Sequence, residues 1–213
     1  YHAVHNFCSV DMSAFYLDVL KDRLYTSPTE GLARRSAQTA MYRILEALTR
    51  MMAPVLSFTA EEIWSYMPGE REASVHLAEF PNFEISLVDT TLEAKYDQLL
   101  AVRSDVAKVL ELARAEKTIG HSLDARVQLA ADGDLALLLK EEAAQLASLF
   151  IVSQVEVTDS LENGSTGEGL PELKILVSKA EGEKCSRCWN YATSVGENEA
   201  HSGICHRCIE ALV

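Results

Sequence analysis

The sequence predicts a mainly α-helical chain in which a helical bundle precedes a small α+β subdomain and a tail that contains four cysteines. Three observations support this prediction. Apolar residues recur at helical spacing through the first half of the chain, they alternate at strand spacing in part of the second half, and four of the five cysteines fall within the last 29 residues. We therefore expect three domains, over residues 1–118, 119–182 and 183–213.

The first two predicted helices are separated by proline. Residues 2–25 contain no proline or glycine and place apolar side chains at helical spacing, and Pro28 marks the break. Residues 32–52 carry an apolar seam that steps alternately by four and three residues, as expected for a helix that buries one face. Pro54 ends this helix or kinks it.

The remainder of the bundle follows from turn and capping signals. Thr59 and Glu62 form a capping-box pattern, which predicts a short helix through Tyr66. Residues 67–89 contain two prolines and a glycine, so we expect an extended loop there. A further long helix is expected from Leu92 to Ala113.

The pattern changes after Gly120, which is expected to stop that long helix. The following segment alternates helix and strand periodicity, which is typical of a small α+β unit. Strands are predicted over residues 125–131, 151–157 and 173–178, a helix over 134–150, and a flexible loop over 163–169.

The composition limits the possible function. The chain has 213 residues, 48% of them hydrophobic, and 32 acidic against 19 basic residues, which gives a net charge of −13. It can bury a core, it has no apolar run long enough for a membrane helix, and it is too acidic for a general nucleic-acid binder. It also begins without Met inside a helical pattern, so we expect a piece of a longer protein.

The charge is distributed unevenly along the chain. Residues 1–50 carry six basic and five acidic residues, whereas residues 119–182 carry four basic and eleven acidic residues. The front of the chain is therefore close to neutral, and the excess acid lies mainly in the middle. A basic surface that binds a nucleic-acid partner is therefore expected only in the less acidic part of the chain.

The strongest chemical signal is a pair of Cys-x-x-Cys motifs, formed by Cys185, Cys188, Cys205 and Cys208. The two motifs are separated by sixteen residues, which matches a known zinc spacing. Two such turns complete a sulfur tetrahedron with no position left for water, so one structural zinc ion is expected, not a catalytic one. Disulfides or free thiols, iron in place of zinc, and a histidine ligand (His201 or His206) are the alternatives.

Residues around these motifs have two possible roles. Arg187 and Arg207 lie inside the turns, where their charge would offset a site of net charge −2. Trp189 and Tyr191 follow the first motif directly and either pack the small domain or offer a stacking surface for a base; packing is the expected role. Cys8 lies alone on an apolar face and is expected in the core.

Four blocks of the sequence, residues 6–26, 52–64, 117–127 and 179–189, together resemble the bacterial isoleucyl-tRNA synthetases, a class I family. Residues 6–26 and 52–64 (MAPVLSFTAEEIW) are similar to the anticodon-binding helical domain of that family. Residues 117–127 (KTIGHSLDARV) resemble its junction into the C-terminal region, and residues 179–189 (KAEGEKCSRCW) resemble the entry to its zinc tail. The first two blocks alone would also fit a valyl or leucyl relative.

The resemblance implies ATP-dependent joining of isoleucine to its tRNA by the parent enzyme, a cytoplasmic ligase of protein biosynthesis. This chain would hold the anticodon stem-loop, while the catalytic and editing domains that it works with would lie upstream. The family's His-Ile-Gly-His and Lys-Met-Ser-Lys-Ser motifs do not occur in the chain. No catalytic residue and no ATP site is therefore expected here, nor any membrane partner, and the protein is expected to be a monomer.

The least acidic segment is the candidate RNA surface. Residues 31–60 contain four arginines and one acid, and the arginines lie off the apolar seam. Their alternative role is ordinary solvated charge, for example Arg50 paired with Glu46. We expect residues 119–182 to face away from RNA. The candidate RNA-binding residues are Arg34, Arg35, Arg43, Arg50, Lys21, Arg23 and Trp189.

Two other functional classes compete with this interpretation. The four-cysteine tail also resembles the zinc finger of formamidopyrimidine-type DNA glycosylases, which would make the chain a DNA-binding module. However, those enzymes need an N-terminal catalytic proline, and this chain starts with Tyr1 and a helical bundle. The other alternative is an acidic interaction scaffold that is held together by zinc and binds no nucleic acid.

Overall fold

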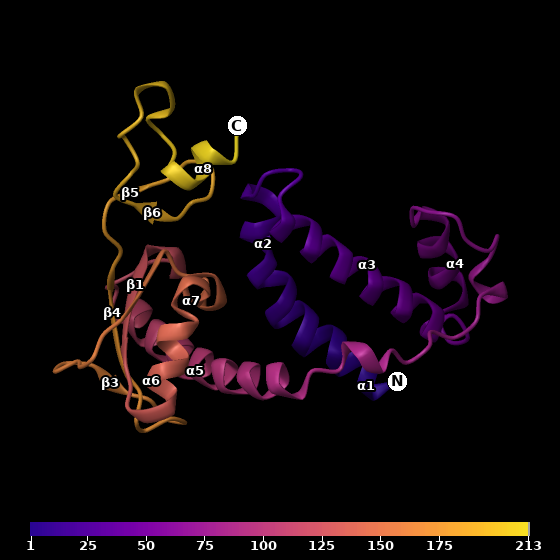
Figure 1. Ribbon diagram of the computed structural model, residues 1–213, viewed down its shortest axis with the longest axis horizontal. Helices are drawn as coiled ribbons and strands as arrows, with labels where there is room; N and C mark the ends of the chain where they lie inside the picture. Colours follow the sequence, from indigo (N-terminus) through magenta and orange to yellow (C-terminus); the bar gives the residue numbers. More distant parts are fainter. Residues whose placement is uncertain (213) are drawn as a thin grey trace. The chain divides into compact units, whose positions relative to one another are not determined.

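The computed structural model describes residues 1–212. It confirms the predicted fold class, with helices in the first half, a small α+β region after them and a cysteine-rich tail (Figure 1). The chain forms two compact units, a front unit over Tyr1–Asp89 and a rear unit over Thr90–Val213. The predicted domain boundaries after residues 118 and 182 stay a prediction.

The front unit begins with one helical run, as predicted. It consists of α1 (His2–Asn6), the π-helix η1 (Phe7–Tyr16) and α2 (Leu17–Thr26). The partly buried side chains in the π-helix are Phe7, Met12, Phe15 and Tyr16, and the steps of five residues from Phe7 to Met12 and of four from Met12 to Tyr16 match its wider turn. Cys8 is exposed, so its expected place in the core was wrong: the inward positions belong to Phe7 and Met12.

Helix α3 (Leu32–Met52) has the predicted bounds and contacts both α2 and α4. Its seam is deepest at Ala37 and at Thr49, whose hydroxyl donates to the Leu45 carbonyl. The helix ends one residue before Ala53, and the chain turns at Pro54.

Helix α4 (Ser57–Tyr66) begins two residues before the predicted cap. The Leu56 N–H donates to the Met52 carbonyl at 2.8 Å, which closes a tight turn and lets the helix restart at once. Thr59 therefore lies inside the helix, and the predicted capping box was wrong.

Residues 67–89 form the predicted loop, with two short 3₁₀ turns at η2 (Val75–Leu77) and η3 (Ile85–Leu87). The loop covers a small core that it shares with α4, where Trp64 and Val75 are buried. The Trp64 indole N–H donates to the Glu72 carbonyl at 2.9 Å. The loop thus supplies the packing that the short helix α4 lacks by itself.

The rear unit opens with the long helix α5 (Thr90–Ala115). The helix ends before Gly120, because Lys117 has a left-handed backbone (φ 61°) and the Thr118 N–H donates back to the Ala113 carbonyl at 2.9 Å. The 3₁₀ turn η4 (Ser122–Asp124) then leads into the sheet.

The rear sheet has the strand order β2-β1-β4-β3. The central strand β1 runs parallel to β2 and antiparallel to β4, and β3 pairs antiparallel with β4. Helices α6 and α7 connect β1 to β2, and α5 contacts β4. The bounds are β1 (Ala125–Ala130), α6 (Gly133–Glu141), α7 (Ala143–Phe150), β2 (Gln154–Val157), β3 (Ser165–Thr166) and β4 (Lys174–Lys179).

The segment 163–169 is not simply a flexible loop, as was predicted. It contains β3, and its end is fixed by Asp105 of α5, which is only 2% exposed. The Asp105 carboxylate accepts backbone N–H bonds from Gly169 (3.0 Å) and Leu170 (2.9 Å). A buried carboxylate needs such partners, so this contact ties the loop to the long helix.

The tail consists of the hairpin β5 (Glu183–Lys184) and β6 (Tyr191–Ala192), the turn η5 (Glu199–His201) and the short helix α8 (His206–Glu210). The Tyr191 N–H of the tail donates to the Ser153 hydroxyl at 2.7 Å. Just before the tail, the Glu181 N–H donates to the Gln154 side chain at 2.9 Å, so the connection to the sheet region is fixed as well. Within residues 1–212, no helix is both long and apolar enough to cross a membrane.

Candidate metal centre and nucleic-acid interface

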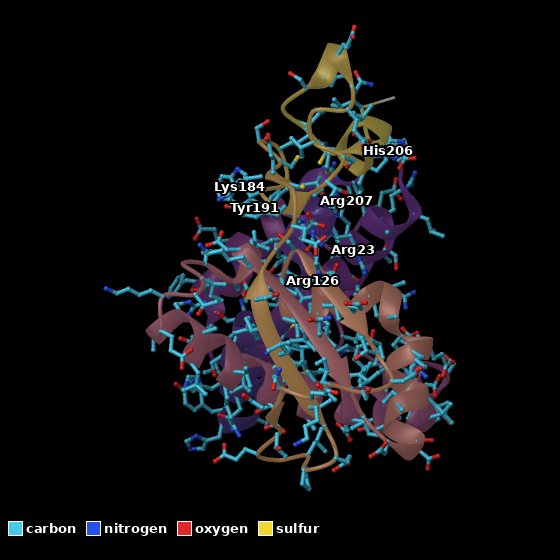
Figure 2. The ribbon with its side chains drawn as sticks, turned by 90° about the vertical axis from the view of Figure 1, so that its left-hand side faces the viewer. Arg23, Arg126, Lys184, Tyr191, His206 and Arg207 are labelled. Carbon is cyan, nitrogen blue, oxygen red and sulfur yellow. The ribbon has the colours of Figure 1, made fainter. Side chains whose placement is uncertain are left out.

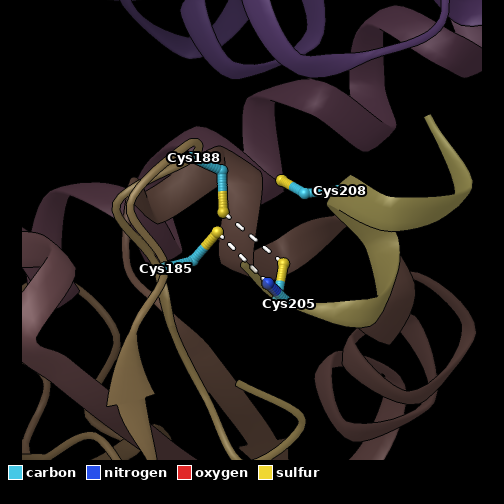
Figure 3. Close-up of side chains that lie close together, drawn as sticks. All are labelled: Cys185, Cys188, Cys205 and Cys208. Carbon is cyan, nitrogen blue, oxygen red and sulfur yellow. Dashed lines mark hydrogen bonds between the residues drawn. The ribbon is translucent and has the colours of Figure 1, made fainter. Parts of the chain in front are cut away.

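The four cysteines are brought together by two different local structures. Cys185 follows β5 directly, and the Trp189 N–H donates to its carbonyl at 2.9 Å, which folds the first motif into a turn. Cys205 caps helix α8, and the Cys208 N–H donates to the Cys205 carbonyl at 2.9 Å. Each motif thereby presents both of its sulfur atoms to the same side (Figure 3).

The sulfur positions fit a tetrahedral metal ion. All four Sγ atoms lie within 4.8 Å of one another, and the Cys188 and Cys205 Sγ atoms are 3.7 Å apart. Four sulfurs at about 2.3 Å from one ion would be about 3.8 Å apart in a tetrahedron. Because four protein ligands complete that shell and three of the cysteines are buried, the site suits a structural zinc ion.

The charges around the thiols also suit a cation. Burial raises the pKa of the Cys185 thiol, but backbone N–H groups of Cys188, Cys205 and Arg187 outweigh it and lower that pKa to about 6. Burial raises the pKa of Cys188 and Cys208 and dominates there. A divalent ion would favour the thiolate form of all four.

The two arginines inside the motifs are placed crosswise. The Arg207 side chain donates to Cys188, and the Arg187 side chain donates to Cys208, so each arginine contacts a thiol of the opposite motif. These donors stabilise thiolate and link the two motifs, as expected for charges that offset a four-thiolate site.

The histidines near the site do not belong to the cysteine cluster, which contains the four sulfurs alone among the described residues. His201 lies exposed in η5, and His206 Nδ1 lies 3.5 Å from Glu210. The histidine-for-cysteine alternative therefore has no support in the geometry.

Gly182 is required where the chain enters the tail. Its backbone is left-handed (φ 86°), and a Cβ there would lie 2.3 Å from the Ala192 carbonyl carbon. The glycine thus lets β5 and β6 pair immediately before the first cysteine. The second loop of the tail is fixed to the first by Ser186, whose hydroxyl donates to the Gly203 carbonyl at 2.9 Å.

The candidate arginines of α3 are engaged within the front unit. Arg35 pairs with Glu30 at 2.7 Å, and Arg50 pairs with Glu46 at 3.1 Å while also donating to the Glu79 carbonyl. Arg43 lies 3.8 Å from Glu84. Arg34 is half-buried and lies 3.5 Å from the Ser27 carbonyl.

The candidates on α2 differ from each other. Lys21 pairs with Asp18 at 2.6 Å, an interaction that raises the pKa of the lysine through its hydrogen bond and charge. Arg23 is exposed and makes no ion pair within residues 1–212. Of the front-unit candidates, Arg23 is therefore the exposed one whose guanidinium group is not engaged by an acid of residues 1–212.

Trp189 is 61% exposed, so the expectation that it packs the small domain was wrong. Its left-handed backbone (φ 66°) turns the side chain outward after Cys188, and Lys184 Nζ lies 5.9 Å from the ring centroid. Tyr191 is half-buried instead. The tail therefore offers an exposed aromatic face with a cation beside it.

One feature was missed in the sequence: a groove of about 470 Å³ in the rear unit, lined by Arg114, Lys117, Lys179 and Tyr191 among others. Its lining comes from the end of α5, from β4 and from β6, up to 77 positions apart. The nearest available signal was that Lys117 and Lys179 each begin a block that had been recognised in the sequence.

Two family models match the chain. The one described as "Anticodon-binding domain of tRNA ligase" matches residues 1–129, and the one described as "Zinc finger found in FPG and IleRS" matches residues 182–211. The two matches cover the helical front and the four-cysteine tail, in the order expected from the sequence blocks.

Curated relatives align with the chain over its full length. It is 67% identical to an isoleucine–tRNA ligase of Syntrophotalea carbinolica, 51% identical to one of Geobacter sulfurreducens and 47% identical to one of Natranaerobius thermophilus, in each case over 100% of the chain. The chain spans 23% of the length of each of these relatives.

Proposed function

Because the chain belongs to the family of anticodon-binding domains of tRNA ligases, we propose that it holds the anticodon stem-loop of isoleucine tRNA. The observation that carries the proposal is the alignment of the whole chain, helical front and zinc tail together, with isoleucine–tRNA ligases. A zinc finger of this type also occurs in the glycosylase group, so the tail by itself does not discriminate. The anticodon-domain match over residues 1–129 favours RNA over duplex DNA.

The parent enzyme in this proposal is an ATP-dependent isoleucine–tRNA ligase of the cytoplasm, where thiols stay reduced for metal binding. Activation of isoleucine and editing belong to upstream domains, and this chain positions the tRNA for them as part of one monomeric protein. We expect no isoleucine-dependent pyrophosphate exchange by the chain alone, since the catalytic motifs of the family do not occur in it.

The proposed zinc ligands are Cys185, Cys188, Cys205 and Cys208. Their sulfur geometry and the zinc-finger match support this assignment. The ion would supply folding energy to a tail of about 30 residues that is too small for a core of its own. It would take no part in chemistry, because the four thiolates fill its coordination shell.

The RNA surface of the front unit remains a proposal that rests on α2 and α3. Arg35 and Arg43 are exposed, and their ion pairs are of the surface kind that costs little to break. Arg23 is exposed without such a pair. Arg34, Arg50 and Lys21 are more restricted by neighbouring carbonyls and acids and are the weaker candidates.

Filter binding tests the function. We expect the chain to bind an isoleucine tRNA transcript more tightly than duplex DNA of equal length at the same salt concentration. Preference for the DNA would support the glycosylase-type alternative, and binding to neither would support an interaction scaffold. The salt concentration must be held fixed, since phosphate contacts make every such affinity depend on salt.

A further inference from the structure

The groove in the rear unit has fixed walls. One wall is the turn after α5, where Asp124 accepts N–H bonds from Gly120 (3.1 Å) and His121 (2.7 Å). The other wall begins at the end of β4, where the Ala180 N–H donates to the Asp124 carbonyl at 2.7 Å. A hollow of about 470 Å³ that is held by backbone hydrogen bonds is formed before any ligand arrives.

The groove concentrates positive charge that has no acidic partner. Lys117 and Lys179 are exposed, and neither makes a side-chain hydrogen bond or ion pair with any residue in the described range 1–212. By contrast, Lys95, Lys108 and Lys140 of the same unit each meet a carboxylate within 2.7 Å.

The neighbours of the two lysines do not cancel this charge. The Asp124 carboxylate accepts two backbone N–H bonds and keeps its negative charge, but it is one acid in a lining that also contains Arg114, Lys117 and Lys179. Arg114 pairs with Glu111 at 2.6 Å, but its buried Nε atom has no partner. In a chain of net charge −13, this hollow therefore attracts an anion.

One aromatic side chain lines the groove, and a second lies in the turn of the same tail hairpin. Tyr191 lines it, and Lys184 is the cross-strand partner of Tyr191 in the tail hairpin, so the two side chains share a face (Figure 2). Lys184 in turn lies beside the exposed Trp189 ring. Cations thus alternate with aromatic rings, which is the arrangement that binds single-stranded nucleic acid by phosphate contact and base stacking.

A structural role for the lysines makes a different prediction. Lys117 lies just beyond the last turn of α5, where a cation stabilises the helix carbonyl end. That role would lower stability on substitution and leave RNA affinity unchanged. It also does not account for Lys179, which stands at the end of a strand.

Building on the proposed function, we propose that this groove binds a single-stranded stretch of the tRNA, with its phosphates at Lys117 and Lys179 and a base on the Tyr191 ring. Lys184 and Trp189 continue the proposed RNA-binding surface along the tail. The proposal places an RNA contact in the rear unit at Lys179, within the acidic segment 119–182, and so departs from the expectation that this whole segment faces away from RNA.

The first test is the affinity of the 213-residue chain for an isoleucine tRNA transcript across a salt series. Lys117→Gln and Lys179→Gln are each expected to weaken binding roughly tenfold. The double variant should reduce the slope of log affinity against log salt by about 1.4, since each single-strand phosphate contact contributes about 0.7. The control, Lys140→Gln, removes an exposed lysine of the same unit that pairs with Asp159, and its affinity should not change.

The second test uses the unaltered chain, so it does not depend on how the variants fold. Lysine acetylation by acetic anhydride is measured by mass spectrometry with and without the tRNA. We expect the tRNA to slow acetylation of Lys117 and Lys179 several-fold and to leave Lys140 unchanged.

The outcomes separate this inference from the proposed function. If the chain binds the tRNA but both lysines label at the same rate and the double variant binds as well as the original, the groove proposal is overturned and the function stands. If the chain does not bind the tRNA, both fall. Equal protection of the lysines by inorganic phosphate at matched ionic strength would contradict RNA as the occupant.

Discussion

The two units of the molecule treat their basic residues in opposite ways. The front unit is close to neutral and carries the arginine-rich helix α3, yet Arg35, Arg43 and Arg50 each lie within 4 Å of a carboxylate. The rear unit contains the acidic segment 119–182, yet Lys117 and Lys179 stand unpaired around a groove. The net charge of a segment is therefore a poor guide to a nucleic-acid surface. A better guide is whether each lysine or arginine is paired with a carboxylate of the protein.

The units also differ in what holds them together. The front unit relies on a helical seam and a loop that covers Trp64. The rear unit has a four-stranded sheet, one buried ionic contact at Asp105 and a cysteine cluster at its end. A change to one of these contacts should affect the stability of its own unit and leave the other unit unchanged. Each contact can therefore be tested with a variant in one unit and a control measured in the same chain.

Loss of the metal should have the largest effect, confined to the tail. Zinc removal by a chelator, or Cys185→Ser, is expected to unfold residues 183–212, because the buried residues of the tail cluster are the cysteines themselves and the ion is what would hold them together. Hydrogen exchange should show loss of protection in the tail and unchanged protection in α3.

Cys8→Ser is the matched control, since Cys8 is exposed in the front unit and lies outside the cluster. It should keep both zinc content and tail protection. Chelation that left the tail protected, or a protein purified without chelator that contained no zinc, would contradict the structural-zinc assignment.

Asp105→Asn should destabilise the rear unit by about 2 kcal/mol, because the N–H groups of Gly169 and Leu170 lose a charged, buried acceptor. Burial raises the pKa of Asp105, but the N–H donors and Lys108 outweigh burial and lower the pKa below its usual value. The stabilisation is therefore present above the unfolded-state pKa near 3.9 and is lost as the pH falls through the lower folded-state value.

Urea unfolding at pH 7 and at pH 3 measures this effect. The difference between Asp105→Asn and the original chain should be full at pH 7 and smaller at pH 3. Asp97→Asn, an exposed position on the same helix, is the control and should cost nothing measurable. An Asp105 variant as stable as Asp97→Asn at pH 7 would remove the carboxylate from its proposed role in fixing the loop.

Exposed aromatic residues allow the same comparison for RNA binding. Trp189→Leu in the rear unit should weaken tRNA binding about tenfold, because base stacking on an aromatic ring contributes roughly 1–3 kcal/mol per base. Tyr66→Leu removes an exposed aromatic side chain of the front unit (82% exposed) and should leave affinity unchanged. Filter binding at one salt concentration is sufficient, and equal losses for the two variants would erase the distinction between the units.

The smallest effect is expected for the front arginines. The double charge reversal Arg35→Glu and Arg43→Glu should weaken tRNA binding about threefold. Most of this loss should come from repulsion between the new carboxylates and the RNA phosphates, which salt screens over roughly one Debye length, and less of it from lost contacts. Filter binding in about 0.15 M salt measures the change. A loss of a hundredfold would show that α3 makes direct phosphate contacts in spite of its ion pairs.

Helix bounds were predictable where proline and the apolar seam agreed. Helix α3 has the predicted range because Pro54 follows a seam that a helix must bury. Helix α4 was placed two residues late because the Thr59–Glu62 pattern is only a local signal, and the tight turn at Leu56 decided the start.

Contacts between distant residues were not predictable from one sequence. The polar segment 163–169 has the composition of a flexible loop, but it is held by the pairing of β3 with β4 and by Asp105, which lies 64 positions before Gly169. The cysteine cluster was predictable because the ligand types and their spacing define the geometry locally. The groove was not, because no motif specifies which lysines the fold will leave without an acidic partner.

The most direct test of the central claim compares two double variants of equal charge change by the salt dependence of tRNA binding. Lys117→Gln with Lys179→Gln should reduce the slope of log affinity against log salt by about 1.4, and Arg35→Gln with Arg43→Gln should reduce it by clearly less, because Glu30 and Glu84 compete with the RNA for these two arginines. The reverse result, with a lower slope for the arginine variant and the original slope for the lysine variant, would contradict the account and place the phosphate contacts in the front unit.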